Sequence, residues 1–149
     1  MKVVMYHPRA AEKRFRLPIS VLTLASVVHE KHDVSIVDAD LLDDPLPELR
    51  RQLREGGTDV VLAVTVMPGP QLSRAVPHSR TLKAEFPHVL IIWGGWFPSM
   101  HTETCLKANY VDFVVRGRAE MMFALLLERI ANNGSFNDVP NLSYRDVDG

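Results

Sequence analysis

Val89-Leu90-Ile91-Ile92-Trp93-Gly94-Gly95-Trp96-Phe97-Pro98 is the stretch that decides the fold of this 149-residue chain. An apolar, β-branched run of this kind is typical of a strand that is buried on both faces of a sheet. The two glycines that follow leave the backbone bare, so a flat group can approach closely where any Cβ would hold it away. We therefore expect a strand that ends at Gly94 and a ligand close to Gly94-Gly95.

Four further runs of the same character are separated by helical patterns, which predicts repeated β-α-β units. The predicted strands are residues 2–6, 33–38, 59–66, 89–94 and 111–115. The predicted helices are residues 19–30, 46–55, 71–86, 99–107 and 120–132. The alternation predicts an α/β fold with a five-stranded parallel sheet and helices on both faces.

The composition narrows the function classes. A content of 46% hydrophobic residues suits one globular domain, and a net charge of -1 with scattered Lys and Arg disfavours a nucleic-acid partner. The single cysteine, Cys105, excludes an internal disulfide framework and any four-cysteine metal site, so we expect a reducing, cytoplasmic location. No apolar run approaches the ~20 residues of a membrane span, and we expect a soluble protein without a membrane partner.

The C-terminal part loses the alternating pattern. We expect residues 1–133 to form the domain and residues 134–149 to be a linker or small edge strand that leads to a further domain. Val147-Asp148-Gly149 has the character of a turn before a second strand, so we expect the chain to be the front of a longer protein.

Ligands of open α/β sheets bind outside the carboxyl ends of the strands. Glycine, proline and polar residues concentrate at these ends in the sequence. The candidate cofactor-binding residues are Tyr6, His7, Pro8, Arg9, Asp38, Thr65, Val66, Met67, Pro68, Gly69, Gly94, Gly95, Trp96, Phe97, Pro98, Arg116, Gly117, Arg118 and Glu120.

Several common ligands are disfavoured. The turn after the first strand, His7-Pro8-Arg9, lacks the glycines of a dinucleotide site, and no Walker loop or Ser/Thr/Gly-rich phosphate cradle is present. A phospho-receiver domain needs acidic residues where this chain has Tyr6 and Thr65. No nucleophile with a base partner can be assembled, and Cys105 lies in a predicted helix, so we expect no catalytic residue.

Two elements at strand ends resemble those of cobalamin-binding domains. Thr65-Val66-Met67, followed after 26 residues by Gly94-Gly95, is similar to their Ser-x-Leu and Gly-Gly elements. In that family the hydroxyl and the bare backbone receive the dimethylbenzimidazole tail of the cofactor. Residues 17–25, 34–39, 93–99 and 111–117 extend the likeness to the N-terminal domain of cobalamin-dependent radical S-adenosylmethionine enzymes, from Met1 to about Tyr144.

The resemblance implies a flavodoxin-like (Rossmann-like) domain that holds cobalamin. The Asp-x-His-x-x-Gly motif that supplies a lower cobalt ligand in other cobalamin proteins is missing after the first strand. The resemblance therefore implies that cobalamin binds base-off, without a histidine ligand, and that the chain has no metal-ligating residue. It also implies a C-terminal radical S-adenosylmethionine domain, which binds S-adenosylmethionine and a 4Fe-4S cluster through three cysteines and acts as a methyltransferase. This chain lacks those cysteines, so we expect it to be non-catalytic by itself.

The chain departs from the family pattern at three places. Gly117-Arg118-Ala119-Glu120 replaces the usual Gly-Glu-Gly-Glu, so we expect Arg118 to meet an amide oxygen of the corrin instead of an acid contact. Ser20 stands where glycine is common, and His7 lies close to the usual ligand position but in a different context.

Two other functions stay open at this point. Asp38 at the end of the second strand would suit a ribose hydroxyl in a nucleotide- or nucleotide-sugar-binding enzyme. Arg118 in place of the acid would suit a degenerate domain kept for protein contacts. Away from the strand ends, we expect Trp93 in the core and His101 at the rim of the site, while His29, His32, His78 and His88 are expected at the surface.

Overall fold

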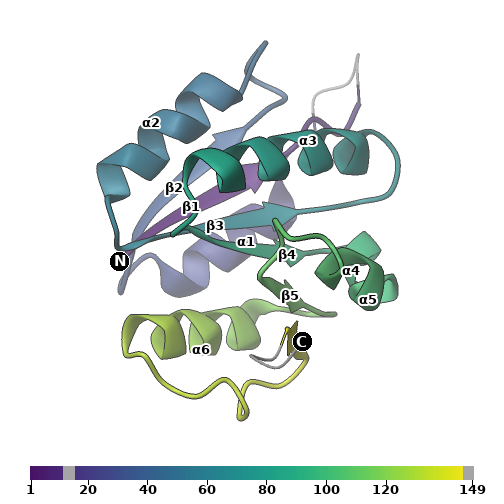
Figure 1. Cartoon of the computed structure of the whole chain (residues 1–149). Coiled ribbons are helices and arrows are strands. Elements are labelled where there is room, and N and C mark those ends of the chain that lie inside the picture. The colour runs from purple at the N-terminus through teal and green to yellow at the C-terminus, as the bar shows by residue number, and fades with distance from the viewer. Residues whose placement is uncertain (12–15, 146–149) are drawn as a thin grey trace.

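The computed structural model describes residues 1–11 and 16–145 and forms a six-stranded sheet in the order β2-β1-β3-β4-β5-β6 (Figure 1). Its strands are β1 (Lys2–His7), β2 (Asp33–Asp38), β3 (Val60–Thr65), β4 (Leu90–Gly94), β5 (Phe113–Val115) and β6 (Leu142–Tyr144). Strands β1 to β5 pair in parallel, with the order 2-1-3-4-5 that is typical of flavodoxin-like sheets. The predicted α/β class is therefore confirmed.

The predicted strand count of five is wrong. Strand β6 pairs antiparallel with β5 and forms the edge of the sheet. Asn141, at φ 57°, turns the chain into this strand, and its carbonyl accepts a hydrogen bond from Arg116 N. The aromatic rings of Phe113, Phe136 and Tyr144 pack together with centroids 5.0–5.9 Å apart. A strand of three residues carries little alternation, so the sequence leaves a linker or a small edge strand open for residues 134–149, and these long-range contacts create the strand.

Six helices accompany the strands. They are α1 (Ile19–Val28), α2 (Leu46–Gly56), α3 (Pro70–Glu85), α4 (Trp96–Met100), α5 (Thr102–Leu106) and α6 (Glu120–Ala131). The single predicted helix at residues 99–107 is wrong, because His101 has φ -128° and ψ 42° and separates two short helices. The other helices begin and end within two residues of the predicted positions.

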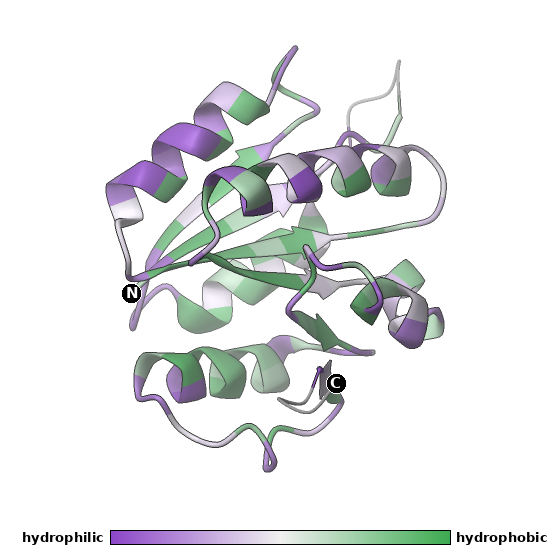
Figure 2. Cartoon of the chain, viewed as in Figure 1, coloured by the Kyte–Doolittle hydropathy of each residue, from purple (hydrophilic) through white to green (hydrophobic). Residues whose placement is uncertain are grey.

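The sheet is covered on both faces, and each face has its own apolar core. Helices α2, α3 and α5 pack on one face, through residues such as Leu49, Leu82 and Cys105. Helices α1 and α6 pack on the other face, through residues such as Val21 and Leu126. Figure 2 shows the strands as predominantly hydrophobic and α2 as largely hydrophilic along its length. The strands are buried on both sides, which explains their uninterrupted apolar sequences.

The connections leave β1 between β2 and β3, so the chain reverses its direction of winding beside β1. A crevice forms at such a reversal, outside the carboxyl ends of the strands. Within the described residues, no helix has the length and apolar character needed to cross a membrane.

Candidate functional site

A cavity of about 270 Å³ lies between the sheet and helices α1 and α6, at the carboxyl ends of the strands. Most of its walls are apolar, and polar groups gather where the strands end. The lining residues are Met5, Ser20, Val21, Thr23, Leu24, Ala63, Val64, Thr65, Ile92, Gly94, Gly95, Val115, Gly117, Arg118, Ala119, Glu120 and Phe123. Pockets for whole drug-sized ligands are usually about 300–1,000 Å³, so this cavity suits one planar part of a larger ligand.

The floor of the cavity follows from the period of two along a strand. Residues Met5, Ala63 and Ile92 contribute to the core on the α1/α6 face from three neighbouring strands. The next positions on this face of β3 and β4 are Thr65 and Gly94, which are paired in register. Because Ala63 is small and Gly94 has no side chain, the sheet surface is lower here, which makes room for the cavity.

Gly94 and Gly95 are glycines for different structural reasons. A Cβ on Gly95 would lie 3.0 Å from Val66 O and 3.1 Å from Val66 N, and Gly95 has φ 101° and ψ -169°, a conformation essentially restricted to glycine. A Cβ on Gly94 would meet only Val115 O, at 3.7 Å. Gly95 is therefore required by the fold, whereas Gly94 keeps the cavity open.

Thr65 places a hydroxyl at the mouth of the cavity. Its Oγ1 lies 3.3 Å from the position that a Cβ on Gly95 would take, and it hydrogen bonds to no other residue of the described ranges. The backbone around it is fixed, because Val66 N donates to Gly94 O (2.8 Å) and Phe97 N donates to Val66 O (3.1 Å). The hydroxyl thus stands on a fixed backbone and is free to bond a ligand.

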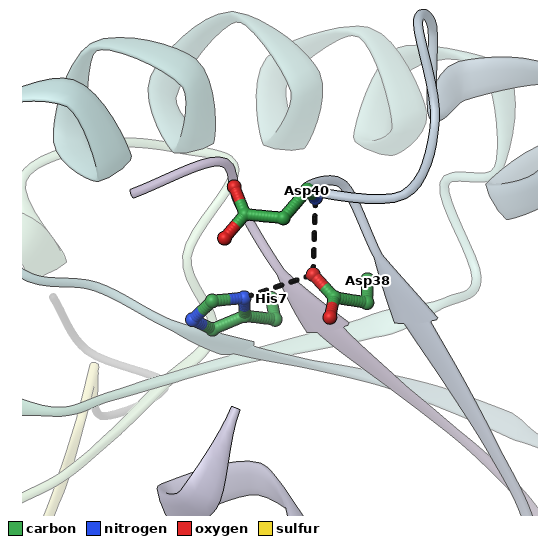
Figure 3. A group of neighbouring side chains, drawn as sticks. All are labelled: His7, Asp38 and Asp40. Atoms are coloured by element: carbon green, nitrogen blue, oxygen red, sulfur yellow. Dashed lines mark hydrogen bonds and ion pairs between the residues drawn. The ribbon is translucent and has the colours of Figure 1, made fainter. Parts of the chain in front are cut away.

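A buried hydrogen-bond network stands at the ends of β1 and β2 (Figure 3). His7 Nδ1 lies 3.1 Å from Asp38 Oδ1, which also accepts from Asp40 N at 3.0 Å. Gln71, only 3% exposed, donates to His7 Nε2 (2.9 Å) and Pro8 O (3.0 Å) and accepts from Met67 N (3.0 Å). An amide NH2 only donates, so His7 Nε2 accepts and His7 Nδ1 carries the hydrogen that it donates to Asp38. Both ring nitrogens are therefore engaged.

Ligand atoms of His7, Asp38 and Asp40 all lie within 4.8 Å of one another, the spacing of a metal-binding group. The Asp40 carboxylate accepts from Ala10 N and Arg16 N, at 3.3 and 3.4 Å. The three side chains satisfy one another and the neighbouring backbone, so their geometry is that of a structural link between the loops after β1 and β2.

The predicted site residues separate into three groups. Those that line the cavity are Thr65, Gly94, Gly95, Gly117, Arg118 and Glu120. A second group lies away from this cavity, in the hydrogen-bond network around His7, in the opposite core, in the hollows beside α3 or in the buried part of α4. Its members are Tyr6, His7, Pro8, Arg9, Asp38, Val66, Gly69, Phe97 and Pro98. Those exposed on the carboxyl edge are Met67, Pro68, Trp96 and Arg116.

Sequence reasoning missed the apolar floor and α1 and α6 walls, among them Met5, Ala63 and Phe123, and also Gln71. The alternation along the strands would have found Met5 and Ala63, because they share a face with Thr65. The prediction that His32 and His78 lie at the surface is wrong, because both are half-buried. His78 Nδ1 is hydrogen bonded to Tyr6 Oη at 2.6 Å. Burial raises the pKa of the Tyr6 hydroxyl and lowers the pKa of His78.

Comparisons with known proteins identify the fold and the family. The family model described as B12 binding domain matches residues 16–127. The anaerobic magnesium-protoporphyrin IX monomethyl ester cyclase of Synechocystis sp. is 26% identical over 132 residues, which are 86% of this chain and 26% of that protein. This chain thus spans about a quarter of the length of the curated relatives it matches.

Two solved structures are similar in fold over 99% of this chain. One is the radical S-adenosylmethionine methyltransferase TsrM from Kitasatospora setae with cobalamin and a 4Fe-4S cluster bound (TM-score 0.78, 18% identity, 29% of that chain). The other is the cobalamin-dependent S-adenosylmethionine radical enzyme OxsB with aqua-cobalamin and S-adenosylmethionine bound (TM-score 0.79, 17% identity, 21% of that chain).

Proposed function

The chain belongs to the B12 binding domain family, and we propose that it holds cobalamin base-off, with the dimethylbenzimidazole tail in the cavity between the sheet and helices α1 and α6. The observation that carries this proposal is the hollow over Ala63 and Gly94. A Cβ on Gly94 would project into it without meeting any protein atom closer than 3.7 Å. The hollow therefore suits a flat, apolar ring that lies against bare backbone.

A free hydroxyl at the mouth of this cavity suits the same ligand. An aromatic ring nitrogen that leaves water without a hydrogen-bond donor costs about 1–3 kcal/mol. Backbone hydrogen bonds fix the chain beside Thr65, and its Oγ1 has no competing partner among the described residues. We assign it as the donor to the benzimidazole nitrogen, while Met5, Ile92 and Phe123 exclude water from the ring.

The network around His7 supports binding without a histidine ligand on cobalt. To reach a metal, His7 would have to give up either Asp38 or Gln71, and each is buried and would lose a partner. Losing such a partner costs about 1–3 kcal/mol, more where a charge is left. His7 therefore serves to hold the strand ends together beneath the cofactor.

We further propose that this chain is the cofactor-holding part of a radical S-adenosylmethionine enzyme of the methyltransferase type. In this proposal residues 1–133 hold the cobalamin, and residues 134–149 lead to the domain that binds S-adenosylmethionine and a 4Fe-4S cluster. Cobalamin, when bound, supplies a cobalt centre that can carry a methyl group. The residues of this chain bind and orient the cofactor, and its single buried Cys105 offers no ligand set for a cluster.

The nucleotide-binding alternative loses its main residue. It depends on an Asp38 carboxylate that is free for a ribose, but Asp38 is 9% exposed and bonds His7 and Asp40 N. The cavity also lies on the face of α1 and α6, and its walls are mostly apolar, which suits a flat aromatic ring better than a sugar.

Titration of the 149-residue protein with hydroxocobalamin, followed by its visible spectrum, tests the proposal. We expect a bound complex with a base-off spectrum, and electron paramagnetic resonance of the cobalt(II) form without nitrogen coupling from the protein. Thr65→Val should weaken binding by about tenfold, the equivalent of one hydrogen bond, and Thr65→Ser should restore most of it. Absence of binding by a folded protein would refute the function, and nitrogen coupling that disappears in His7→Gln would refute the unligated cobalt.

A further inference from the structure

Ser99 joins the two loops that border the cavity. Its hydroxyl donates to Gly95 O (2.7 Å), one turn earlier in α4, and accepts from Gly117 N (3.0 Å) in the loop after β5. The first bond is common for serine in a helix, but the second spans 18 residues of sequence. One hydroxyl thus uses its donor and an acceptor lone pair to connect separate parts of the chain.

The loops that Ser99 connects lie on two sides of the cavity mouth. Gly94 and Gly95 line it from the end of β4, and Gly117 to Glu120 line it from the end of β5. Below them, β4 and β5 are held by strand pairing, which ends at Gly94 and Val115. Beyond that pair, the bond from Gly117 N to Ser99 is the side-chain link between these loops in the part of the chain that the structure describes.

The Gly117 loop has little else to fix its distance from β4. Gly117 has φ 69° and is exposed, and a Cβ there would have no atom within 4 Å. Arg116 N is bonded in the opposite direction, to Asn141 O beside β6. Ala119 packs against the apolar core of the α1/α6 face, so the Ser99 hydroxyl specifically ties Gly117, at the start of this segment, to the loop after β4.

We propose that Ser99 is a positioning residue that sets the width of the cavity mouth and thereby the fit of the cofactor's nucleotide tail. This inference rests on the proposed function, since it concerns the same cavity. Ser99 does not line the cavity and acts through Gly95 and Gly117. Its effect is therefore confined to the part of the ligand that enters between the loops.

The test compares cobalamin with cobinamide, which has the corrin ring but no nucleotide tail. Dissociation constants of both are measured by absorbance titration for the wild-type chain, Ser99→Ala and Ser99→Thr. Ser73→Ala is the matched control, because Ser73 also lies in a first helical turn but bonds only Pro70 O in its own helix. Circular dichroism and thermal unfolding verify that each variant is folded.

We expect Ser99→Ala to bind cobalamin about tenfold more weakly, as for one lost hydrogen bond, and to bind cobinamide as the wild type does. Ser99→Thr, which keeps the hydroxyl, should retain most of the affinity, and Ser73→Ala should change neither constant. An equal loss for both ligands, or no loss in Ser99→Ala, overturns the positioning role while cobalamin binding by the wild type stands. Failure of the wild type to bind cobalamin overturns the proposed function itself.

Discussion

Substitution of the two glycines one at a time separates fold from ligand binding. The structure predicts that Gly94→Val leaves the protein folded and weakens cobalamin binding, whereas Gly95→Ala damages the fold. The difference comes from their surroundings, because a Cβ on Gly94 has only Val115 O at 3.7 Å, whereas a Cβ on Gly95 meets two atoms of Val66 at 3.0 and 3.1 Å.

The sizes of the two effects follow from these contacts. For Gly95→Ala, a backbone conformation that is essentially restricted to glycine costs about 1–3 kcal/mol, and the clash with rigid backbone adds a similar amount. Since small domains have only about 5–15 kcal/mol of stability, this variant should lose a large part of it. For Gly94→Val, the free energy of unfolding should change by less than about 1 kcal/mol, because a β-branched residue suits a strand.

The ligand meets the new side chain in Gly94→Val. Adding methyl groups to a filled space costs about 1–3 kcal/mol, which corresponds to a loss of about five- to 150-fold in affinity for cobalamin. Gly94→Ala adds one carbon only and should show a smaller loss. Cobinamide, which has no tail to place in the cavity, should bind all Gly94 variants with the affinity of the wild type.

Urea unfolding at pH 7 and absorbance titration of the same preparations provide both measurements. The predicted difference between the two glycines is refuted if Gly94→Val unfolds as easily as Gly95→Ala, because the new Cβ at Gly94 would then clash with other atoms of the protein. It is equally refuted if folded Gly94→Val keeps the wild-type affinity for cobalamin, because the tail would then lie elsewhere.

Three further predictions concern groups outside the cavity. Burial lowers the pKa of His78 below 6.5, so the unfolded chain binds more protons than the folded protein, and stability should fall as pH decreases below about 6.5. The urea midpoints at pH 7.5 and 5.5 should therefore differ less in His78→Gln than in the wild type, because the glutamine amide can still hydrogen bond to Tyr6. Burial raises the pKa of the Cys105 thiol to about 11, so a thiol reagent at pH 8 should label Cys105 in the urea-unfolded chain and not in the native protein. Rapid labelling of the native protein would contradict this burial. Asp112→Asn should lower the free energy of unfolding by about 1–3 kcal/mol, because Asp112 accepts a hydrogen bond from Lys83 Nζ (2.8 Å). Adding Lys83→Met should recover part of this loss, and an equal or greater loss in the double variant would contradict a coupled pair.

The main elements of the fold were predictable because their signals are local. Five strands and four helices carry apolar runs or helical periods that span most of their length, and they begin and end within two residues of the predicted positions. The remaining elements depend on contacts distant in sequence. Strand β6 exists through pairing with β5 and aromatic packing, and the break between α4 and α5 at His101 is a single backbone conformation.

The site was predictable only in part, for a similar reason. Gly95 and Gly117 have positive φ, a backbone requirement that makes such turn glycines visible in the sequence, and Gly94 is visible as the neighbour of Gly95. The apolar floor made by Met5 and Ala63 has the composition of any core strand, so its role appears only when the strands are placed side by side. Gln71 likewise looks like an ordinary helical residue until His7 and Met67 are brought to it.

The carboxyl edge of the sheet consists of two differently built halves. On the side of α2 and α3, polar groups are consumed by internal bonds, including Tyr6 to His78 and Arg9 to the carbonyls of Ala39 and Leu42. On the side of α1 and α6, small residues leave a mostly apolar cavity, and the Thr65 hydroxyl in its lining has no hydrogen-bond partner within the described residues.

The hydrogen-bond network of His7, Asp38 and Gln71 joins the ends of β1 and β2 to the loop after β3 and makes the first half a rigid support. Figure 3 shows the part of it formed by His7 and Asp38. We therefore expect a ligand with one flat ring to insert it beside Gly94 and Thr65. Rigidity on one half and a hollow on the other are what a domain needs to hold a large cofactor in one orientation, because little conformational entropy is then lost on binding. The same division explains why the candidate residues near His7 are structural, while those near Gly94 are left free to line the cavity.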